Sequence, residues 1–141
     1  MDRRAYLRTT GAALAVGTAG CLDAFAGGLS EEDYDIGMSQ NAFLPDEYEV
    51  SVGETVVWGN NGSRGHTVTA YESALPEGAA FFASGDRTST DAAREAWYDT
   101  GEGDIAPGET FSHTFEVAGE HHYFCIPHES GGMVGTIVVR E

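Results

Sequence analysis

The stretch YFCIPHESGGMVGTIVV, residues 123–139, joins two β-strand patterns through a short loop. An aromatic run ends at Cys125, and a run rich in β-branched residues closes the stretch. Proline and glycine interrupt regular strands, and both Pro127 and the Gly131–Gly132 pair lie between the two runs. The stretch therefore predicts two strands joined by a tight loop, with Cys125 at the end of the first strand.

Alternating apolar and polar residues mark further strands along the chain. Residues 48–52 and 111–117 alternate in this way, and a glycine follows each run, at Gly53 and Gly119. We count about seven such runs, which also include residues 34–38, 55–58 and 66–71. The pattern predicts an all-β fold, an antiparallel Greek-key β-sandwich that forms one domain over residues 34–141.

The segment between Leu75 and Pro107 interrupts the strand pattern, because it is acidic and rich in glycine. Within it, TDAAREAWY, residues 90–98, predicts a short helix capped by Thr90 or Asp91. We interpret residues 75–106 as an insertion between two strands of the sandwich. The sequence shows no internal repeat and no second domain.

The amino terminus has the features of an export signal. Arg3 and Arg4 precede a weakly apolar run over residues 11–20, which is well short of the roughly 20 residues that a membrane-spanning helix needs. We therefore predict a twin-arginine signal over residues 1–20.

The end of this signal predicts a lipid anchor. The segment TAGC, residues 18–21, resembles the lipobox of lipoproteins, although Thr18 stands where leucine is usual. A lipid on Cys21 would hold the protein at the outer face of the cell membrane, and residues 21–33 have the composition of a flexible tether. The alternative is a plain cleaved signal that leaves Cys21 without a role.

The charge of the chain is strongly acidic. It has 23 acidic residues against 7 arginines and no lysine, which gives a formal net charge of −16. Self-repulsion on this scale destabilises a compact state, but molar salt shortens the screening length to about 3 Å. A high-salt environment is our first hypothesis, and an acidic docking surface for a cationic partner is the second. Nucleic acid is excluded as a partner.

The chain has only two cysteines, Cys21 and Cys125. If Cys21 belongs to the anchor, Cys125 has no disulfide partner and is a buried thiol, a metal ligand or a nucleophile. His128 and Met133 follow it on the same predicted loop, which brings a thiolate, an imidazole and a thioether together. With a second histidine, this soft donor set is typical of a copper site that has a weak axial methionine.

The second histidine is expected from another part of the sandwich. His66 is the preferred candidate, because it opens a predicted strand after a glycine-rich turn. His121 comes next, since it shares its strand face with Cys125 but lies deeper in the sandwich. His113 is expected to be a hydrogen-bonded core residue, and His122 is expected to face solvent.

Two other chemistries fit a cysteine beside a histidine less well. A thiol nucleophile with a histidine base would lack a third orienting residue and an oxyanion donor, and Met133 would have no role. Zinc is poorly matched by a thioether as its fourth ligand. Since no open coordination position is expected, the sequence predicts a protein that is not an enzyme.

The stretch quoted first resembles the carboxy-terminal signature of the plastocyanin-like blue copper proteins. AFLPDEYEVSVGETVVWGNNGSRGH, residues 42–66, resembles the upstream half of the same family. With the export signal and the acidity, the chain is most similar to halocyanins, the small membrane-anchored copper proteins of salt-loving archaea. The resemblance implies a cupredoxin-like fold and one copper ion, bound by His66, Cys125, His128 and Met133.

The resemblance also implies a function. The protein would be a monomeric carrier that shuttles single electrons, as Cu(II)/Cu(I), between membrane-bound redox complexes on the outer membrane face. Electrons would pass through the edge of His128, inside an apolar docking patch that Ile126 and Pro127 help to form. A copper delivery or storage module is the alternative, because it would use the same soft ligands.

Two positions beside the first histidine depart from the family pattern. Gly65 and Thr67 stand where the family usually has proline and asparagine. Thr67 still offers a backbone N–H to the sulfur of Cys125, and its hydroxyl can replace the amide that ties the two ligand loops together. We therefore expect the departures to affect the tuning of the site and not its existence.

Overall fold

The structure, a computed structural model, describes residues 29–141. The predicted export signal and Cys21 lie outside this range, so the division into signal, tether and domain stays a prediction. Within residues 29–141, no helix combines the length and the apolar character that crossing a membrane requires. The first described element is η1, a 3-10 turn over Glu31–Asp33.

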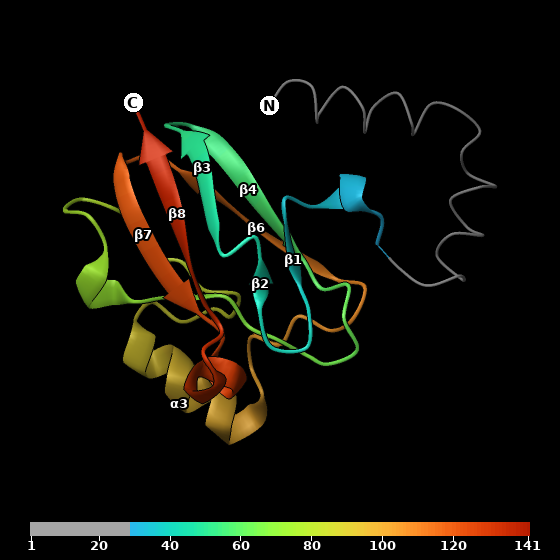
Figure 1. Cartoon of the computed structure of the whole chain (residues 1–141). Coiled ribbons are helices and arrows are strands. Elements are labelled where there is room, and N and C mark those ends of the chain that lie inside the picture. The colour runs from blue at the N-terminus through green and yellow to red at the C-terminus, as the bar shows by residue number, and fades with distance from the viewer. Residues whose placement is uncertain (1–28) are drawn as a thin grey trace.

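Eight strands form two four-stranded sheets that pack face to face (Figure 1). The first sheet has the order β2-β1-β4-β6, with β2 (Phe43–Leu44), β1 (Ile36–Met38), β4 (Glu54–Gly59) and β6 (Thr110–Phe115). The second has the order β3-β8-β7-β5, with β3 (Glu47–Ser51), β8 (Val134–Arg140), β7 (Gly119–Phe124) and β5 (Thr69–Ala70). The predicted β-sandwich is thus confirmed.

The sheets are mixed, because two of their strand pairs are parallel. β3 runs parallel to β8 with Tyr48 opposite Ile137, and β1 runs parallel to β4 with Ile36 opposite Trp58. The other pairs are antiparallel, as predicted: β1–β2, β4–β6, β5–β7 and β7–β8. Alternation along one strand reports which side chains are buried and carries no information on the direction of the neighbouring strand.

The core lies between the two sheets and contains large aromatic side chains. Trp58 is completely buried, and its ring lies within 6.3 Å of four other aromatic rings, those of Phe82, Phe111, Phe115 and Tyr123. Strand β8 alternates between buried and more exposed residues along its length. Cys125 and Met133 belong to the same core cluster, so the end of the sandwich is closed by side chains with sulfur donors.

The segment between β5 and β6 holds the predicted helix, which is α3 (Thr90–Thr100) and therefore two residues longer than predicted. Its N-cap is Ser89, whose Oγ accepts a hydrogen bond from the N–H of Ala92 at 3.1 Å. The prediction of Thr90 or Asp91 as the cap was wrong, because the Thr90 oxygen accepts the N–H of Glu72 at 2.9 Å while its hydroxyl donates to the Ala70 carbonyl at 2.8 Å. Gly101 ends the helix in the left-handed conformation that favours glycine.

Two 3-10 segments complete the fold, η2 (Glu72–Ala74) and η3 (Ile126–Gly131). The strand predicted over residues 66–71 is shorter than expected, since only β5 forms a ladder there, and His66 pairs in an isolated bridge with Ile105. The end of strand β7, the segment η3 and the helix α3 all lie at one end of the sandwich. This end is opposite the carboxy terminus (Figure 1).

Candidate metal centre

Cys125 lies immediately after β7, and its side chain points into the core with no solvent exposure. Tyr123 shares this inward direction, because alternate residues of a strand lie on one face. Phe124 and Ile126 point to the opposite side and belong to a second, smaller hydrophobic cluster. The strand therefore delivers one soft sulfur donor to the interior and two apolar side chains to its outer face.

The loop after Cys125 folds back on itself through backbone hydrogen bonds. The N–H of Cys125 donates to the Met133 carbonyl at 3.0 Å, and the N–H of Met133 donates to the His128 carbonyl at 3.2 Å. Gly132 adopts φ +93°, a left-handed conformation that favours glycine. The predicted tight loop is confirmed, and it brings the residues at 125, 128 and 133 to one end of the core.

His66 enters from the other side of the site and is completely buried. Its backbone makes a reciprocal pair with Ile105, with N–H···O distances of 3.2 and 2.7 Å. A side chain at position 65 would displace the Asp104 carboxylate, because a Cβ there would lie 2.0 Å from one of its oxygens. One of the two departures from the family pattern, Gly65, thus has a local packing reason.

Three donor atoms converge at this end of the sandwich. The Sγ of Cys125 lies 3.7 Å from the Nδ1 of His66 and 3.4 Å from the Nδ1 of His128. The three donor atoms all lie within 4.8 Å of one another, and this is the one such cluster of histidine, cysteine or carboxylate groups within residues 29–141. Met133 is fully buried beside them in the core. These four residues have the arrangement of a type 1 copper site, and the prediction of one copper ion is confirmed.

The metal-free site is electrically neutral at pH 7. Burial, and then the charge of His128, lowers the pKa of His66 to about 4. Burial and the charge of Arg64 lower the pKa of His128, and burial raises the pKa of the Cys125 thiol. Both imidazoles are therefore uncharged and able to bind metal, whereas the thiol has to lose a proton to become a ligand.

The remaining histidines lie outside this cluster. His121 is buried as predicted, but its Nε2 lies 2.8 Å from the Val117 carbonyl oxygen, so its ring is engaged further along the sandwich. His113 stacks on Phe82 with ring centroids 4.7 Å apart, and His122 is partly exposed on the outer face. The structure thus brings His66, and not His121, to Cys125 and His128.

One predicted surface residue is buried. Ile126 was expected to line an exposed docking patch, but it is only 3% exposed because it packs under helix α3 with Ala93 and Phe124. Sequence reasoning also missed the ion pair between Arg94 and Glu129, which joins α3 to the ligand loop. No local sequence pattern indicates this ion pair, since its two residues lie 35 positions apart.

Comparisons with known proteins agree with this geometry. Residues 31–140 match the model of the copper-binding proteins of the plastocyanin/azurin family. Plastocyanin of Vicia faba is 36% identical over 101 residues, which cover 70% of this chain and 88% of that protein. The chloroplastic plastocyanin of Hordeum vulgare is 32% identical over 139 residues, which cover 97% of this chain and 81% of that protein.

A solved structure of an amicyanin mutant in its reduced Cu(I) form aligns with a TM-score of 0.54. It is 26% identical and covers 74% of this chain and 79% of its own. The fold and the site together define a cupredoxin. The chain belongs to the plastocyanin/azurin family of copper-binding proteins, and it is a plastocyanin-like electron carrier and not an enzyme.

Proposed function

We propose that this protein is a halocyanin-like carrier that passes single electrons between membrane-bound redox complexes at the outer face of the cell membrane. His66, Cys125, His128 and Met133 are its four copper ligands. The convergence of the Cys125, His66 and His128 donor atoms within 4.8 Å is the observation that carries the proposal.

The donor set suits copper in both of its common oxidation states. When bound, copper supplies a one-electron Cu(II)/Cu(I) couple. Thiolate and imidazole ligands suit Cu(II), and thiolate and thioether ligands suit Cu(I). The chain holds His66, Cys125 and Met133 completely buried, which excludes water from three of the four donors. The N–H of Thr67 donates to the Cys125 sulfur at 3.4 Å and stabilises its thiolate form.

His128 is the route by which electrons enter and leave. It is the one proposed ligand that is not fully buried, and a partner docking over the η3 loop would come closest to the site there. Val134, which is 43% exposed, and the partly exposed Pro127 supply apolar surface near it. The docking patch is therefore formed without Ile126.

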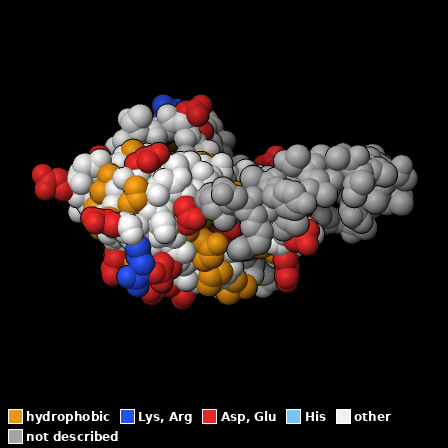
Figure 2. All heavy atoms as spheres, turned by 90° about the horizontal axis from the view of Figure 1, so that it is seen from above, with side chains coloured by type: hydrophobic (Ala, Val, Ile, Leu, Met, Phe, Trp, Pro, Cys, Tyr) orange, Lys and Arg blue, Asp and Glu red, His pale blue; other side chains and the backbone are white. Residues whose placement is uncertain are grey.

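The cellular setting is proposed from the sequence. A twin-arginine signal over residues 1–20 and a lipid on Cys21 would place the domain of residues 34–141 on a tether over 21–33, outside the membrane. The acidity supports a high-salt environment: Figure 2 shows acidic side chains spread over the end of the molecule where β3 and β8 finish. It equally suits a partner with a cationic docking surface.

A copper delivery or storage module is the competing function. Such a protein has to exchange its metal readily, whereas three of the four donors here have no exposed surface. Burial slows exchange and favours the carrier.

The first experiment is to add copper to residues 22–141 at high salt and to record the visible and electron paramagnetic resonance spectra. We expect an intense blue thiolate band, a narrow copper hyperfine splitting and repeated one-electron cycling without loss of metal to a chelator. Cys125→Ser should fold, because the exchange of sulfur for oxygen is small, and should lack the band. A colourless wild-type protein would refute the ligand set, and loss of copper within one redox cycle would favour the storage module.

A further inference from the structure

Helix α3 covers the outer face of the strand that supplies the thiolate. Phe124 and Ile126, the two neighbours of Cys125, are buried with Ala93 of the helix, and Tyr71 and Trp97 pack against them. The insertion thus contributes a second small hydrophobic cluster that lies outside the sandwich core. Its position gives the helix direct contact with the segment on which the metal donors are mounted.

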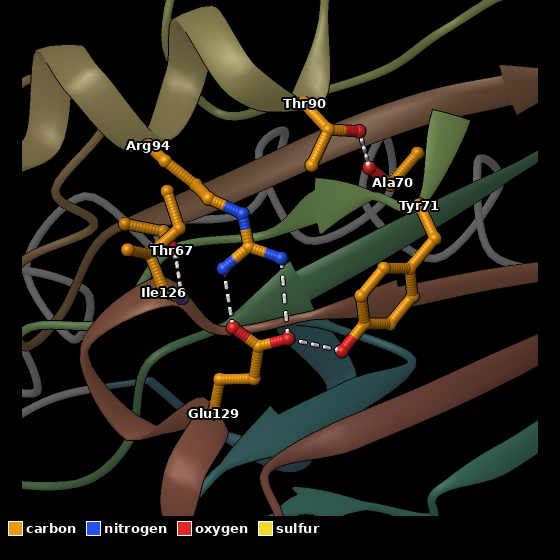
Figure 3. A network of polar contacts seen from close by, with 7 residues as sticks. All are labelled: Thr67, Ala70, Tyr71, Thr90, Arg94, Ile126 and Glu129. Carbon is orange, nitrogen blue, oxygen red and sulfur yellow. Dashed lines mark hydrogen bonds and ion pairs between the residues drawn. The ribbon is translucent and has the colours of Figure 1, made fainter. Parts of the chain in front are cut away.

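Glu129, the residue after His128, connects this loop to the helix. Its carboxylate accepts two hydrogen bonds from the Arg94 guanidinium, at 2.5 and 3.3 Å, and a third from the Tyr71 hydroxyl at 2.7 Å (Figure 3). Two parallel N–H···O bonds between a guanidinium and a carboxylate fix orientation as well as distance. The backbone of the ligand loop is therefore held one residue from His128.

The Arg94 side chain is itself held in place by an aromatic surface. Its guanidinium lies 4.5 Å from the centre of the Phe124 ring, and the rings of Tyr71 and Phe124 stack with their centroids 4.3 Å apart. The ion pair is partly buried, with the side chains of Arg94 and Glu129 34% and 29% exposed. Partly buried pairs are screened less by salt than exposed ones, so this contact persists at high ionic strength.

The helix is also fixed to the sheet at its own amino terminus. The Thr90 hydroxyl donates to the Ala70 carbonyl of β5 at 2.8 Å and accepts the N–H of Glu72 at 2.9 Å. Strand β5 pairs in turn with β7, where Thr69 lies opposite Phe124. These contacts form a closed path, which runs from β7 through the ligand loop, Glu129, Arg94 and α3 and returns through β5 to β7. A closed path resists displacement of any one of its parts.

We infer that the insertion is a clamp on the metal-binding loop, and that Arg94 is a positioning residue that acts through Glu129 to hold His128 in one place. The inference rests on the proposed role of His128 as a ligand. A loop that is held before metal binds needs little rearrangement when metal binds or changes oxidation state. The clamp therefore lowers the barrier to electron transfer without contributing a donor atom.

The test uses variants with opposite changes in charge. Arg94→Met removes the guanidinium but keeps a stem that packs on Phe124, and Glu129→Gln removes the carboxylate but keeps an acceptor for Tyr71. Arg87→Met is the matched control, because it breaks the comparable ion pair of Arg87 with Glu102, at 2.9 Å, which does not involve the ligand loop. It changes the net charge as Arg94→Met does.

Amide hydrogen exchange of residues 126–133 in the copper-free protein is the first readout. We expect Arg94→Met and Glu129→Gln, the two loop variants, to exchange these amide hydrogens about tenfold faster than wild type. This corresponds to a decrease of about 1.4 kcal/mol in the free energy of opening the loop, whereas Arg87→Met should match wild type. Electron self-exchange of the copper-loaded protein is the second readout. Both loop variants should be slower than wild type, although one raises the net negative charge and the other lowers it.

If Arg94→Met and Glu129→Gln both exchange the amide hydrogens of residues 126–133 at the wild-type rate, the clamp is overturned. Faster amide exchange with unchanged self-exchange and an unchanged copper spectrum would overturn the positioning role of Arg94. Failure of the proposed ligand set is recognised separately, because the wild-type protein would then lack the thiolate band. The amide exchange of the copper-free loop reports on the clamp in either case.

Discussion

The Thr67 hydroxyl accepts a hydrogen bond from the N–H of Ile126 at 2.8 Å. The N–H of the same threonine donates to the sulfur of Cys125 at 3.4 Å. Thr67 follows His66, and Ile126 follows Cys125, so one residue joins the two segments that carry the donors. This is the role that we expected the hydroxyl to take over from the asparagine of the family.

Thr67→Val should destabilise the protein while leaving the copper site in place. Valine has nearly the same shape but offers no acceptor, and an unsatisfied buried N–H costs about 1–3 kcal/mol. Chemical denaturation of the copper-free protein measures the loss. Thr67→Ser, which keeps the hydroxyl, should recover most of it. A valine variant as stable as wild type would mean that the tie contributes nothing.

The local parts of this fold could be predicted because each has its own sequence signal. The loop between Cys125 and Met133 has proline and glycine at the bends, and the strand alternation shows in the residues that are buried. His66 is the histidine that the structure brings to Cys125 and His128, because a glycine-rich turn places it at the end of the sandwich, where the loop with Cys125 also lies.

The remaining parts depend on contacts between distant segments. Ile126 has the sequence setting of an exposed loop residue, but α3 packs over it. The Arg94–Glu129 pair joins two segments whose sequences do not indicate that they are in contact. The helix cap is Ser89 and not Thr90, because the Thr90 oxygen accepts the N–H of Glu72 and its hydroxyl donates to the Ala70 carbonyl. Tertiary contacts of this kind override local propensity.

Met133→Leu should give a folded, coloured copper protein with a changed reduction potential. The substitution keeps the volume of the side chain, so its cost in stability should stay below about 1.5 kcal/mol. With copper bound, the Met133 thioether would be a weak donor that tunes the potential, while the Cys125 thiolate and the two imidazoles would retain the metal. Voltammetry measures the potential.

Met38→Leu is the control, because Met38 is equally buried in the same core but lies in β1. It should leave the potential as in wild type. If Met133→Leu instead loses copper altogether, the thioether is a stronger determinant of binding than we propose.

Salt should stabilise the folded protein. The chain has a net charge of −16, and raising the ionic strength from about 0.1 M to about 1 M shortens the screening length from about 10 to about 3 Å. The free energy of unfolding, measured by denaturation in urea, should therefore rise with sodium chloride. The combined change Glu95→Gln and Asp99→Asn removes two exposed charges of α3 and should reduce the rise. Equal stability at low and high salt would contradict a role for charge repulsion.

Acid should destabilise the copper-free protein through His113. This ring stacks on Phe82 and meets Phe115 edge to face, with both centroid distances at 4.7 Å. Burial, and then the charge of His121, lowers the pKa of His113 below its ordinary value of 6.5. The unfolded chain therefore binds this proton more readily than the folded protein. The stability that the neutral ring contributes is present above about pH 6.5 and is lost as the pH falls through the lowered pKa.

His113→Phe keeps an aromatic ring between Phe82 and Phe115 but cannot bind a proton. The free energy of unfolding should therefore fall less between about pH 7.5 and about pH 5 in this variant than in wild type. His66 and His128 are unchanged in both proteins, so their contributions cancel in the comparison. An unchanged loss in His113→Phe would mean that the acid sensitivity arises elsewhere.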